Sequence, residues 1–180
     1  MMGTGKSTVA ALLGGMLGLG AVDTDQLVEG RASRTVAEIF EEDGEAGFRL
    51  AEARAMAEVG EMAGPLVVSV GGGAVLAAPN RAAMRALGTV VWLRARPATL
   101  AARLRAGRDR PLLSTGPGNP SGATTAHDVL VQLGTERRPL YEEVADIVVD
   151  VDDLSAPEVA RRVADALIER GAPAAGHRPR

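Results

Sequence analysis

Short apolar runs alternate with longer helical patterns along this chain of 180 residues, and no other feature limits its possible folds as strongly. The candidate strands are the segment that ends at Asp23 and residues 65–70, 89–93 and 145–151. Each is almost continuously apolar, as expected of a strand with helices on both faces. The helical patterns cover residues 6–17, 36–58, 80–87, 98–105, 126–144 and 157–169. This alternation predicts an α/β fold, with a parallel sheet flanked by helices.

A chain of this length is expected to form one domain, which we place at residues 1–170. Within it, residues 107–125 are crowded with Gly, Pro, Ser and Thr. A loop of this length inside a compact domain is typical of a functional segment, so we predict a mobile lid at about residues 105–125. The final residues, 171–180, are predicted to form a disordered tail.

The composition excludes several classes of protein. There is no cysteine, so disulfide frameworks and cysteine-based metal sites are excluded. The formal net charge of −3 gives no reason to expect nucleic acid or a membrane as a partner. No apolar run approaches the roughly 20 residues of a membrane span. We expect a cytoplasmic protein, and a monomer is the expected state.

Residues 3–8 read GTGKST, which is typical of a phosphate-binding loop that opens a helix. Gly3 and Gly5 would let backbone N–H groups converge on phosphate oxygens, and the helix would present its N-terminus to the same anion. Lys6 would reach the β- and γ-phosphates, and the Ser7 hydroxyl would bind Mg²⁺. The alternative is a turn of small residues that caps a helix.

The full motif has a further glycine, which would stand one residue before Met1, and it follows a buried strand. Neither precedes GTGKST in this sequence. We therefore expect the chain to begin inside its loop and to lack the first, central strand. We expect a gap in the sheet between the strand ending near Asp23 or Val70 and the strand ending near Val151, unless some other segment fills it. Low stability and low activity would follow.

Two carboxylates follow the first apolar run. Asp23 and Asp25 are two residues apart, so in extended backbone their side chains point the same way. One could hold Mg²⁺ through water, and the other could hydrogen-bond or deprotonate a substrate hydroxyl. The alternative is an aspartate that caps the next helix.

Arginines and glycines supply the remaining candidates. Arg49 and Arg137 could clamp a carboxylate between planar guanidinium groups, although each alone is typical of a solvated surface. Residues 71–73 are three glycines directly after a buried strand, where a ligand could approach the backbone closely. Arg110 in the expected lid could neutralise charge on the γ-phosphate, or it could be an ordinary charged loop residue.

Taken in order, these pieces resemble shikimate kinase, a small P-loop kinase of the nucleoside monophosphate kinase type. The resemblance runs from Met1 to about Glu169 and rests on the motifs GTGKST, DTDQLVE, AEIFEEDGEAGFRLAE, SVGGGAV, RPLL and RRPLYEEVA. It implies a P-loop kinase fold with a lid. It also implies transfer of the γ-phosphate of ATP to the 3-hydroxyl of shikimate, in aromatic amino-acid biosynthesis.

On the phosphate side, the resemblance implies that Lys6 contacts the transferred phosphate and that Ser7 ligates one Mg²⁺. Asp23 would support this metal through water, and Arg110 would be the lid arginine. The implied ATP-binding residues are Gly3, Thr4, Gly5, Lys6, Ser7, Thr8 and Arg110.

On the substrate side, the resemblance implies that Arg49 and Arg137 grip the shikimate carboxylate, with Gly71, Gly72 and Gly73 lining the pocket. Asp25 would hold the shikimate hydroxyls and is the candidate base, and Glu52 would orient Arg49. The implied catalytic residues are Lys6, Asp25 and Arg110.

The sequence departs from the family in two further places. Residues 110–137 are longer than usual, and residues 150–158 hold no obvious counterpart of the basic residue that contacts adenine. Arg103 or Arg105 could make that contact instead.

Two alternatives stay open. One is a small kinase for gluconate or a nucleotide, although paired arginines favour a carboxylate and the aromatic content of 2% opposes a base pocket. The other is a non-catalytic domain of the same kind, which the shortened opening suggests.

Overall fold

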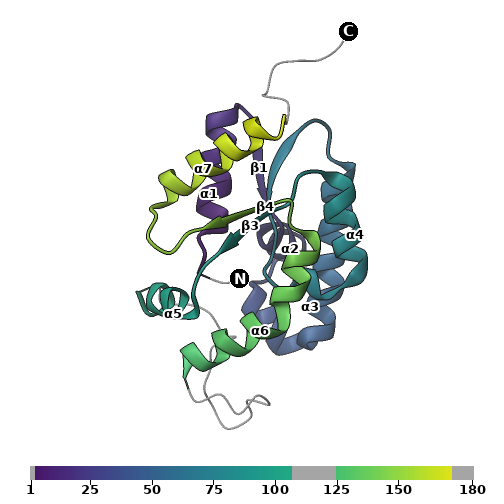
Figure 1. The fold of residues 1–180 in the computed structure, drawn as a ribbon. Coiled ribbons are helices and arrows are strands. Elements are labelled where there is room, and N and C mark those ends of the chain that lie inside the picture. The colour runs from purple at the N-terminus through teal and green to yellow at the C-terminus, as the bar shows by residue number, and fades with distance from the viewer. Residues whose placement is uncertain (1–2, 107–124, 172–180) are drawn as a thin grey trace.

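The computed structural model describes residues 3–106 and 125–171, and within them strands and helices alternate as predicted (Figure 1). Almost all of the predicted lid and of the predicted tail lies outside the described residues. Arg110 also lies outside them. The elements in chain order are α1 (Lys6–Leu17), β1 (Gly20–Asp23), α2 (Thr24–Ala32), α3 (Val36–Glu61), β2 (Leu66–Ser69), the 3₁₀ turn η1 (Ala74–Leu76), α4 (Ala78–Leu87), β3 (Val91–Arg94), α5 (Pro97–Ala106), α6 (Ala126–Val144), β4 (Ile147–Asp150) and α7 (Ala156–Glu169).

The strands pair in parallel, which confirms the predicted sheet type. Strand β1 pairs with β2 from Gly20 opposite Leu66 to Asp23 opposite Ser69. Strand β3 pairs with β4 in the same parallel sense. Within the described residues these are two separate two-stranded sheets, and no strand joins them. The expected interruption of the sheet is therefore present, between the β1–β2 pair and the β3–β4 pair.

Helices pack around the two pairs of strands in two groups. Helices α1 and α7 lie side by side, and α3, α4 and α6 gather on the other side (Figure 1). The main core joins α1, β3, β4 and α7 through Val9, Leu13, Leu93, Val149 and Val163. A second core around Trp92 and Tyr141 joins β3 to α3, α4 and α6. Parallel strands flanked by helices on both sides are the architecture that the alternation predicts.

Strand β4 departs from the prediction that both faces of each strand are covered. Its residues alternate between buried and exposed, and the Val148 side chain is 45% exposed. Helix α7 packs on one face, where Ile147 and Val149 join the main core. The expectation of full coverage was wrong for β4 and for the start of β1, where Gly20 and Ala21 are exposed, because an apolar run does not show how many of its faces a helix will reach.

Two helices differ from the predicted patterns. The apolar patterns do not include α2, because residues 24–32 have no strong apolar stripe, and only the alternative of an aspartate cap implied a helix there. Helix α3 was predicted to end near residue 58, and it runs to Glu61 with a break at Gly44, where φ is 70°. Positive φ is strained for a residue with a side chain and free for glycine. The break redirects the second half of α3, which carries Arg49 and Glu52.

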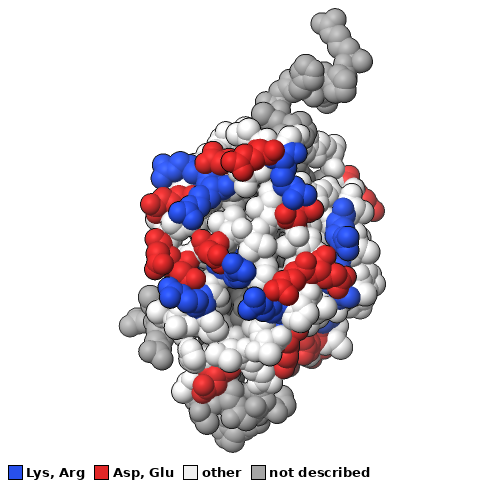
Figure 2. Space-filling view, in the orientation of Figure 1, with Lys and Arg blue, Asp and Glu red and all other residues white. Residues whose placement is uncertain are grey.

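Charged side chains are interspersed on the face shown in Figure 2, where acidic and basic groups lie next to one another. Many of them are paired, such as Arg94 with Asp150 and Arg170 with Asp146. This face presents no broad surface of a single charge. Among the described residues, no helix is both long and apolar enough to cross a lipid bilayer.

Candidate active site

The predicted phosphate loop turns directly into α1. Gly3 and Gly5 both adopt positive φ, at 76° and 81°, so glycine is required at both positions. Gly5 is the N-cap of α1 and has no side chain to bond the first helical N–H groups. A helix start of this kind has backbone donors and a partial positive charge for an anion. Thr4 is buried between the two glycines, whereas Gly5, Ser7 and Thr8 are exposed.

A hydrogen bond ties this loop to the end of β1. The Ser7 hydroxyl donates to Asp23 Oδ2 at 2.6 Å, and the Asp25 backbone N–H donates to Asp23 Oδ1 at 2.9 Å. Asp23 is therefore the N-cap of α2, as the alternative interpretation predicted. It also lies beside Ser7, as the metal-site interpretation requires, so one carboxylate satisfies both descriptions.

The residues of this corner fit a magnesium ion. Hydroxyl and carboxylate oxygens are the ligands that Mg²⁺ takes, usually one or two from the protein with waters and substrate phosphates completing the shell. Ser7 and Asp23 supply one of each. In the described part of the chain, no cluster of three or more His, Cys, Asp or Glu side chains forms a cage that would hold a metal by itself.

The second half of α3 carries a buried ion pair. Arg49 Nη1 lies 2.8 Å from Glu52 Oε2, and the Arg49 Nη2 atom lies 3.2 Å from Glu45 Oε1. The Glu52 side chain is 1% exposed, so this carboxylate has left water almost completely. Burial raises the pKa of Glu52, and the hydrogen bond and charge of Arg49 act in the opposite direction. The predicted contact between Glu52 and Arg49 is present.

Two of the three glycines after β2, Gly71 and Gly73, lie against charged side chains. A Cβ at Gly71 would lie 2.7 Å from Asp25 Oδ1 and 2.8 Å from Glu52 Oε1. A Cβ at Gly73 would collide with the Arg49 guanidinium. The Gly71 N–H also donates to the buried Thr24 hydroxyl at 3.0 Å. Glycine is required at positions 71 and 73 because the side chains of Asp25, Glu52 and Arg49 approach the backbone closely there.

Helix α6 reaches the same turn with two side chains one helical turn apart. Arg137 Nη1 donates to the Gly72 carbonyl at 3.2 Å, and the Tyr141 hydroxyl donates to the same oxygen at 2.6 Å. The Tyr141 ring stacks on Trp92 at 5.4 Å between centroids, and burial raises the pKa of Tyr141. Sequence reasoning gave no role to Tyr141. The available signal was its spacing of four residues from Arg137, which puts both on one helix face.

Among the side chains around residues 71–73, two polar atoms are buried without a hydrogen-bond partner: Glu52 Oε1 and Arg137 Nε. Buried polar atoms are nearly always paired, so an exception in a folded chain points to a ligand or water. Both atoms belong to the cluster around residues 71–73. The predicted substrate residues Asp25, Arg49, Arg137 and the three glycines therefore come together at one place, although they come from α2, α3, α6 and the turn after β2.

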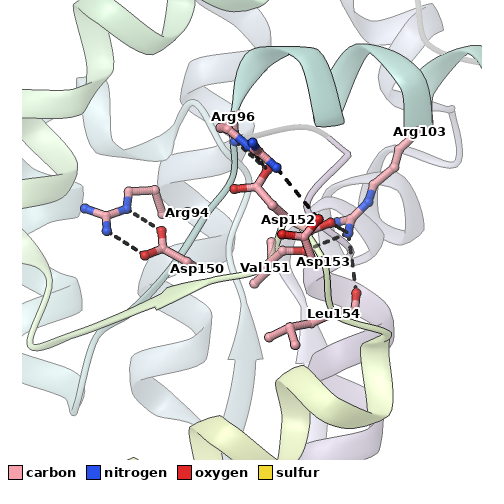
Figure 3. A network of polar contacts seen from close by, with 8 residues as sticks. All are labelled: Arg94, Arg96, Arg103, Asp150, Val151, Asp152, Asp153 and Leu154. Carbon is pink, nitrogen blue, oxygen red and sulfur yellow. Dashed lines mark hydrogen bonds and ion pairs between the residues drawn. The ribbon is translucent and has the colours of Figure 1, made fainter.

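A cavity of about 260 Å³ lies beside the phosphate loop. Arg103 of α5 lines it and donates to the Val151 carbonyl at 2.7 Å (Figure 3). Arg103 is therefore beside the loop, whereas the Arg105 side chain lies outside the described residues. The cavity lining is Gly3, Thr4, Gly5, Thr8, Val9, Arg103, Leu154, Ala156 and Val159.

Comparison with known proteins decides the family. The family model described as shikimate kinase matches residues 2–168. The chain belongs to the shikimate kinase family. A shikimate kinase of Symbiobacterium thermophilum is 44% identical over 174 residues, covering 95% of this chain and 94% of the relative. A second, from Actinobacillus succinogenes, is 39% identical over 166 residues, covering 92% and 90%.

Solved structures of shikimate kinases share the fold. The shikimate kinase of Acinetobacter baumannii in complex with shikimate matches with a TM-score of 0.85 at 31% identity, covering 96% of this chain and 91% of that chain. The enzyme of Bacteroides thetaiotaomicron matches with a TM-score of 0.82, also at 31% identity, covering 93% and 94%. The predicted P-loop kinase fold and the predicted class of enzyme, an ATP-dependent kinase that acts on shikimate, are confirmed.

Membership of the shikimate kinase family leaves the roles of individual residues as predictions. The structure brings the predicted substrate residues together around Gly71–Gly73 and holds Ser7 against Asp23. It leaves Arg110 outside the described residues.

Proposed function

We propose that this chain transfers the γ-phosphate of ATP to the 3-hydroxyl of shikimate, with the carboxylate of shikimate held between Arg49 and Arg137. The observation that carries the proposal is the convergence of these two arginines, from α3 and α6, on the three-glycine turn. Arg137 brings a buried Nε–H that has no partner among the described residues. A carboxylate bound there would satisfy that donor and match the planar guanidinium groups.

Asp25 would orient the acceptor hydroxyl and take its proton. Its carboxylate lies over Gly71 beside Glu52, and its backbone N–H is bonded to Asp23. In the proposed arrangement, Asp25 would stand between the arginines that hold the carboxylate and the Ser7–Asp23 pair. Positioning of the hydroxyl contributes most to phosphoryl transfer, because the transition state is loose and requires little help from a base.

Gly3, Gly5 and the start of α1 would hold the phosphates of ATP, with Lys6 on the transferred group and with Thr4 and Thr8 in the same loop. The remainder of the nucleotide would extend into the cavity beside Arg103. Ser7 would hold Mg²⁺ directly and Asp23 through water. When bound, this ion would neutralise charge on the phosphate oxygens. Arg110 would add a positive charge from the lid. The monomeric state, the cytoplasmic location and the single-domain boundary at residue 170 stay predictions.

The decisive experiment measures ADP release by the purified chain with ATP and Mg²⁺ in the presence of shikimate, gluconate or nucleoside monophosphates. We expect release with shikimate and background rates with the others. Lys6→Ala is the control, and it should abolish release while the fold persists by circular dichroism. Release with gluconate or a nucleotide and none with shikimate would refute the proposal. Binding of shikimate without release under any condition would identify a non-catalytic domain.

A further inference from the structure

Helix α5 begins without the capping box that starts α3, α6 and α7. In a capping box, a side chain at the third helical position accepts a hydrogen bond from the backbone N–H of the N-cap residue. Such boxes begin three helices here: Thr35 with Glu38 in α3, Thr125 with Asp128 in α6, and Ser155 with Glu158 in α7. Helix α5 starts at Pro97 and has no acidic residue in its first turn, so it cannot complete such a box from its own sequence.

The missing carboxylate comes from Asp152, more than fifty positions along the chain. Asp152 Oδ1 accepts a hydrogen bond from the Arg96 backbone N–H, just before α5, at 2.9 Å (Figure 3). The Thr99 side chain, at the third helical position, bonds the same carboxylate. Burial raises the pKa of Asp152, but the bonds to Thr99 and Arg96 outweigh this and lower it overall. Asp152 therefore acts in α5 as Glu38 acts in α3, but from another segment.

The next residue provides a contrast. The Asp153 side chain is 91% exposed, and its contact is an ion pair with Arg96 Nη2 at 3.7 Å. The Asp152 side chain is 14% exposed, and its Oδ1 lies 3.4 Å from Arg96 Nε in addition to the backbone bond. An exposed ion pair of this length contributes little to stability. Of the two adjacent carboxylates, only Asp152 caps the helix.

Helix α5 holds Arg103 one turn beyond Thr99. Arg103 Nη2 donates to the Val151 carbonyl at 2.7 Å, with longer contacts to the carbonyls of Asp152 at 3.3 Å and Leu154 at 3.4 Å. The same side chain lines the cavity beside the phosphate loop. The segment after β4 thus holds α5 at two points, through the Asp152 carboxylate at its start and through backbone carbonyls at Arg103 (Figure 3).

We propose that Asp152 is a positioning residue for the nucleotide: by capping α5 from the segment after β4, it fixes Arg103 against the wall of the cavity beside the phosphate loop. This rests on the proposed function, in which that cavity receives ATP. Asp152 acts through α5 and does not touch the nucleotide. Its loss should weaken nucleotide binding and leave shikimate binding unchanged, because the carboxylate-binding residues lie on α3 and α6.

The test compares Asp152→Ala with the matched control Asp153→Ala. Asp152→Ala should raise the KM for ATP and the Kd for ADP about three- to tenfold, the range that loss of a helix cap produces in an equilibrium constant. The KM for shikimate should stay within about twofold. Asp153→Ala should leave every constant within about twofold. Asp152→Asn retains an oxygen that can accept from the Arg96 N–H, so it should recover most of the loss.

Coupling to Arg103 separates positioning from general stability. If Asp152 acts through Arg103, its replacement in an Arg103→Ala background should change the Kd for ADP by less than about twofold. An undiminished effect in that background, or equal changes in the two KM values, would overturn the proposal. Should Asp152→Ala fail to fold, Thr99→Val supplies the same comparison with a smaller change, because it removes one of the bonds to the Asp152 carboxylate.

The outcome also separates this inference from the proposed function. If Arg103→Ala leaves the Kd for ADP unchanged and Lys6→Ala leaves the Kd for ATP unchanged, the cavity beside the phosphate loop does not receive the nucleotide, and the nucleotide site of the proposed function is wrong. If those two variants weaken nucleotide binding and Asp152→Ala does not, the positioning role alone is wrong.

Discussion

The two sides of the candidate site are built in different ways. The carboxylate side is the cluster of side chains around residues 71–73, where the substrate carboxylate would bind. There Glu52 is 1% exposed, Tyr141 is 7% exposed, and side chains from three helices meet over one turn. On the phosphate side, Gly5, Ser7 and Thr8 are exposed, and the loop is shaped by two glycines in positive φ. One side is made of fixed side chains, and the other is made of backbone.

In the proposed function, this difference would decide how each side recognises its ligand. A carboxylate is small and planar, so two arginines held at a fixed distance and angle can select it. Phosphates have many oxygens, and a row of backbone N–H groups at a helix start suits them without any particular side chain. We therefore expect substitutions on the carboxylate side to act mainly on the KM for shikimate. Substitutions of Asp25, which would hold the reacting hydroxyl of the substrate, should act mainly on kcat.

The largest effect is expected at Asp25, which lies where the two sides meet. Asp25→Asn should lower kcat about 100-fold, the small end of a general-base effect, because positioning dominates in phosphoryl transfer. The KM for ATP should be nearly unchanged. Steady-state kinetics beside the exposed control Asp153→Asn test this. Normal turnover of Asp25→Asn would show that this carboxylate serves only the start of α2.

The next effect tests the carboxylate side directly. Arg137→Ala should raise the KM for shikimate about 30-fold or more, since removal of one partner of a buried, hydrogen-bonded charge pair costs about 2–5 kcal/mol. Arg137→Lys should recover little, because an ammonium lacks the planar fork. The neighbouring Arg138 pairs with Glu142 and its side chain is 62% exposed, so Arg138→Ala is the matched control. Equal kinetics of the two alanine variants would remove Arg137 from the site.

Substitution of a glycine under the guanidinium should have a smaller effect. Gly73→Ala places a Cβ against Arg49 and should displace it, which raises the KM for shikimate about tenfold, within the usual cost of overpacking. Gly15→Ala is the control, because a Cβ there meets nothing within 4 Å. Kinetic constants and thermal midpoints would be measured for both. A Gly73→Ala variant with unchanged shikimate kinetics would show that Arg49 does not need its present position.

The smallest effect is expected at Tyr141. Tyr141→Phe removes one donor to the Gly72 carbonyl but leaves the Arg137 bond and the stacking on Trp92 in place. We expect the KM for shikimate to rise about three- to tenfold, as for one hydrogen bond, with the KM for ATP unchanged. A change in the KM for ATP alone would contradict the division between the two sides.

Much of the fold could be predicted because it depends on local pattern. The parallel strands, the helix over residues 126–144 and the break in regularity around the glycines follow from apolar spacing and turn residues. The apolar pattern did not reveal helix α2, because its residues lack an apolar stripe, and only the possible aspartate cap pointed to it. The exposed face of β4 was missed because strand composition does not reveal which helices will reach it.

The site could be predicted only in part. The motifs identified Arg49, Arg137 and the three glycines, but two uses of a residue cannot be separated by sequence alone. Asp23 is both the N-cap of α2 and the partner of Ser7. Tyr141 was overlooked because a tyrosine on an apolar helix face is usually core, and it is also that here. Its hydroxyl gains a role from the Gly72 carbonyl, which belongs to a turn 69 residues away in the chain.

The starts of the helices show most clearly what each level decides. The sequence alone determines the starts of α3, α6 and α7, because the carboxylate and hydroxyl that cap each helix are three residues apart and meet as soon as one turn forms. The tertiary structure decides the start of α5, where the carboxylate is that of Asp152 and arrives only when the segment after β4 packs beside β3. The same holds for the carboxylate side of the site. In the sequence, Arg49 and Arg137 are each typical of a solvated surface. They come to the same place because two helices deliver them to one glycine turn.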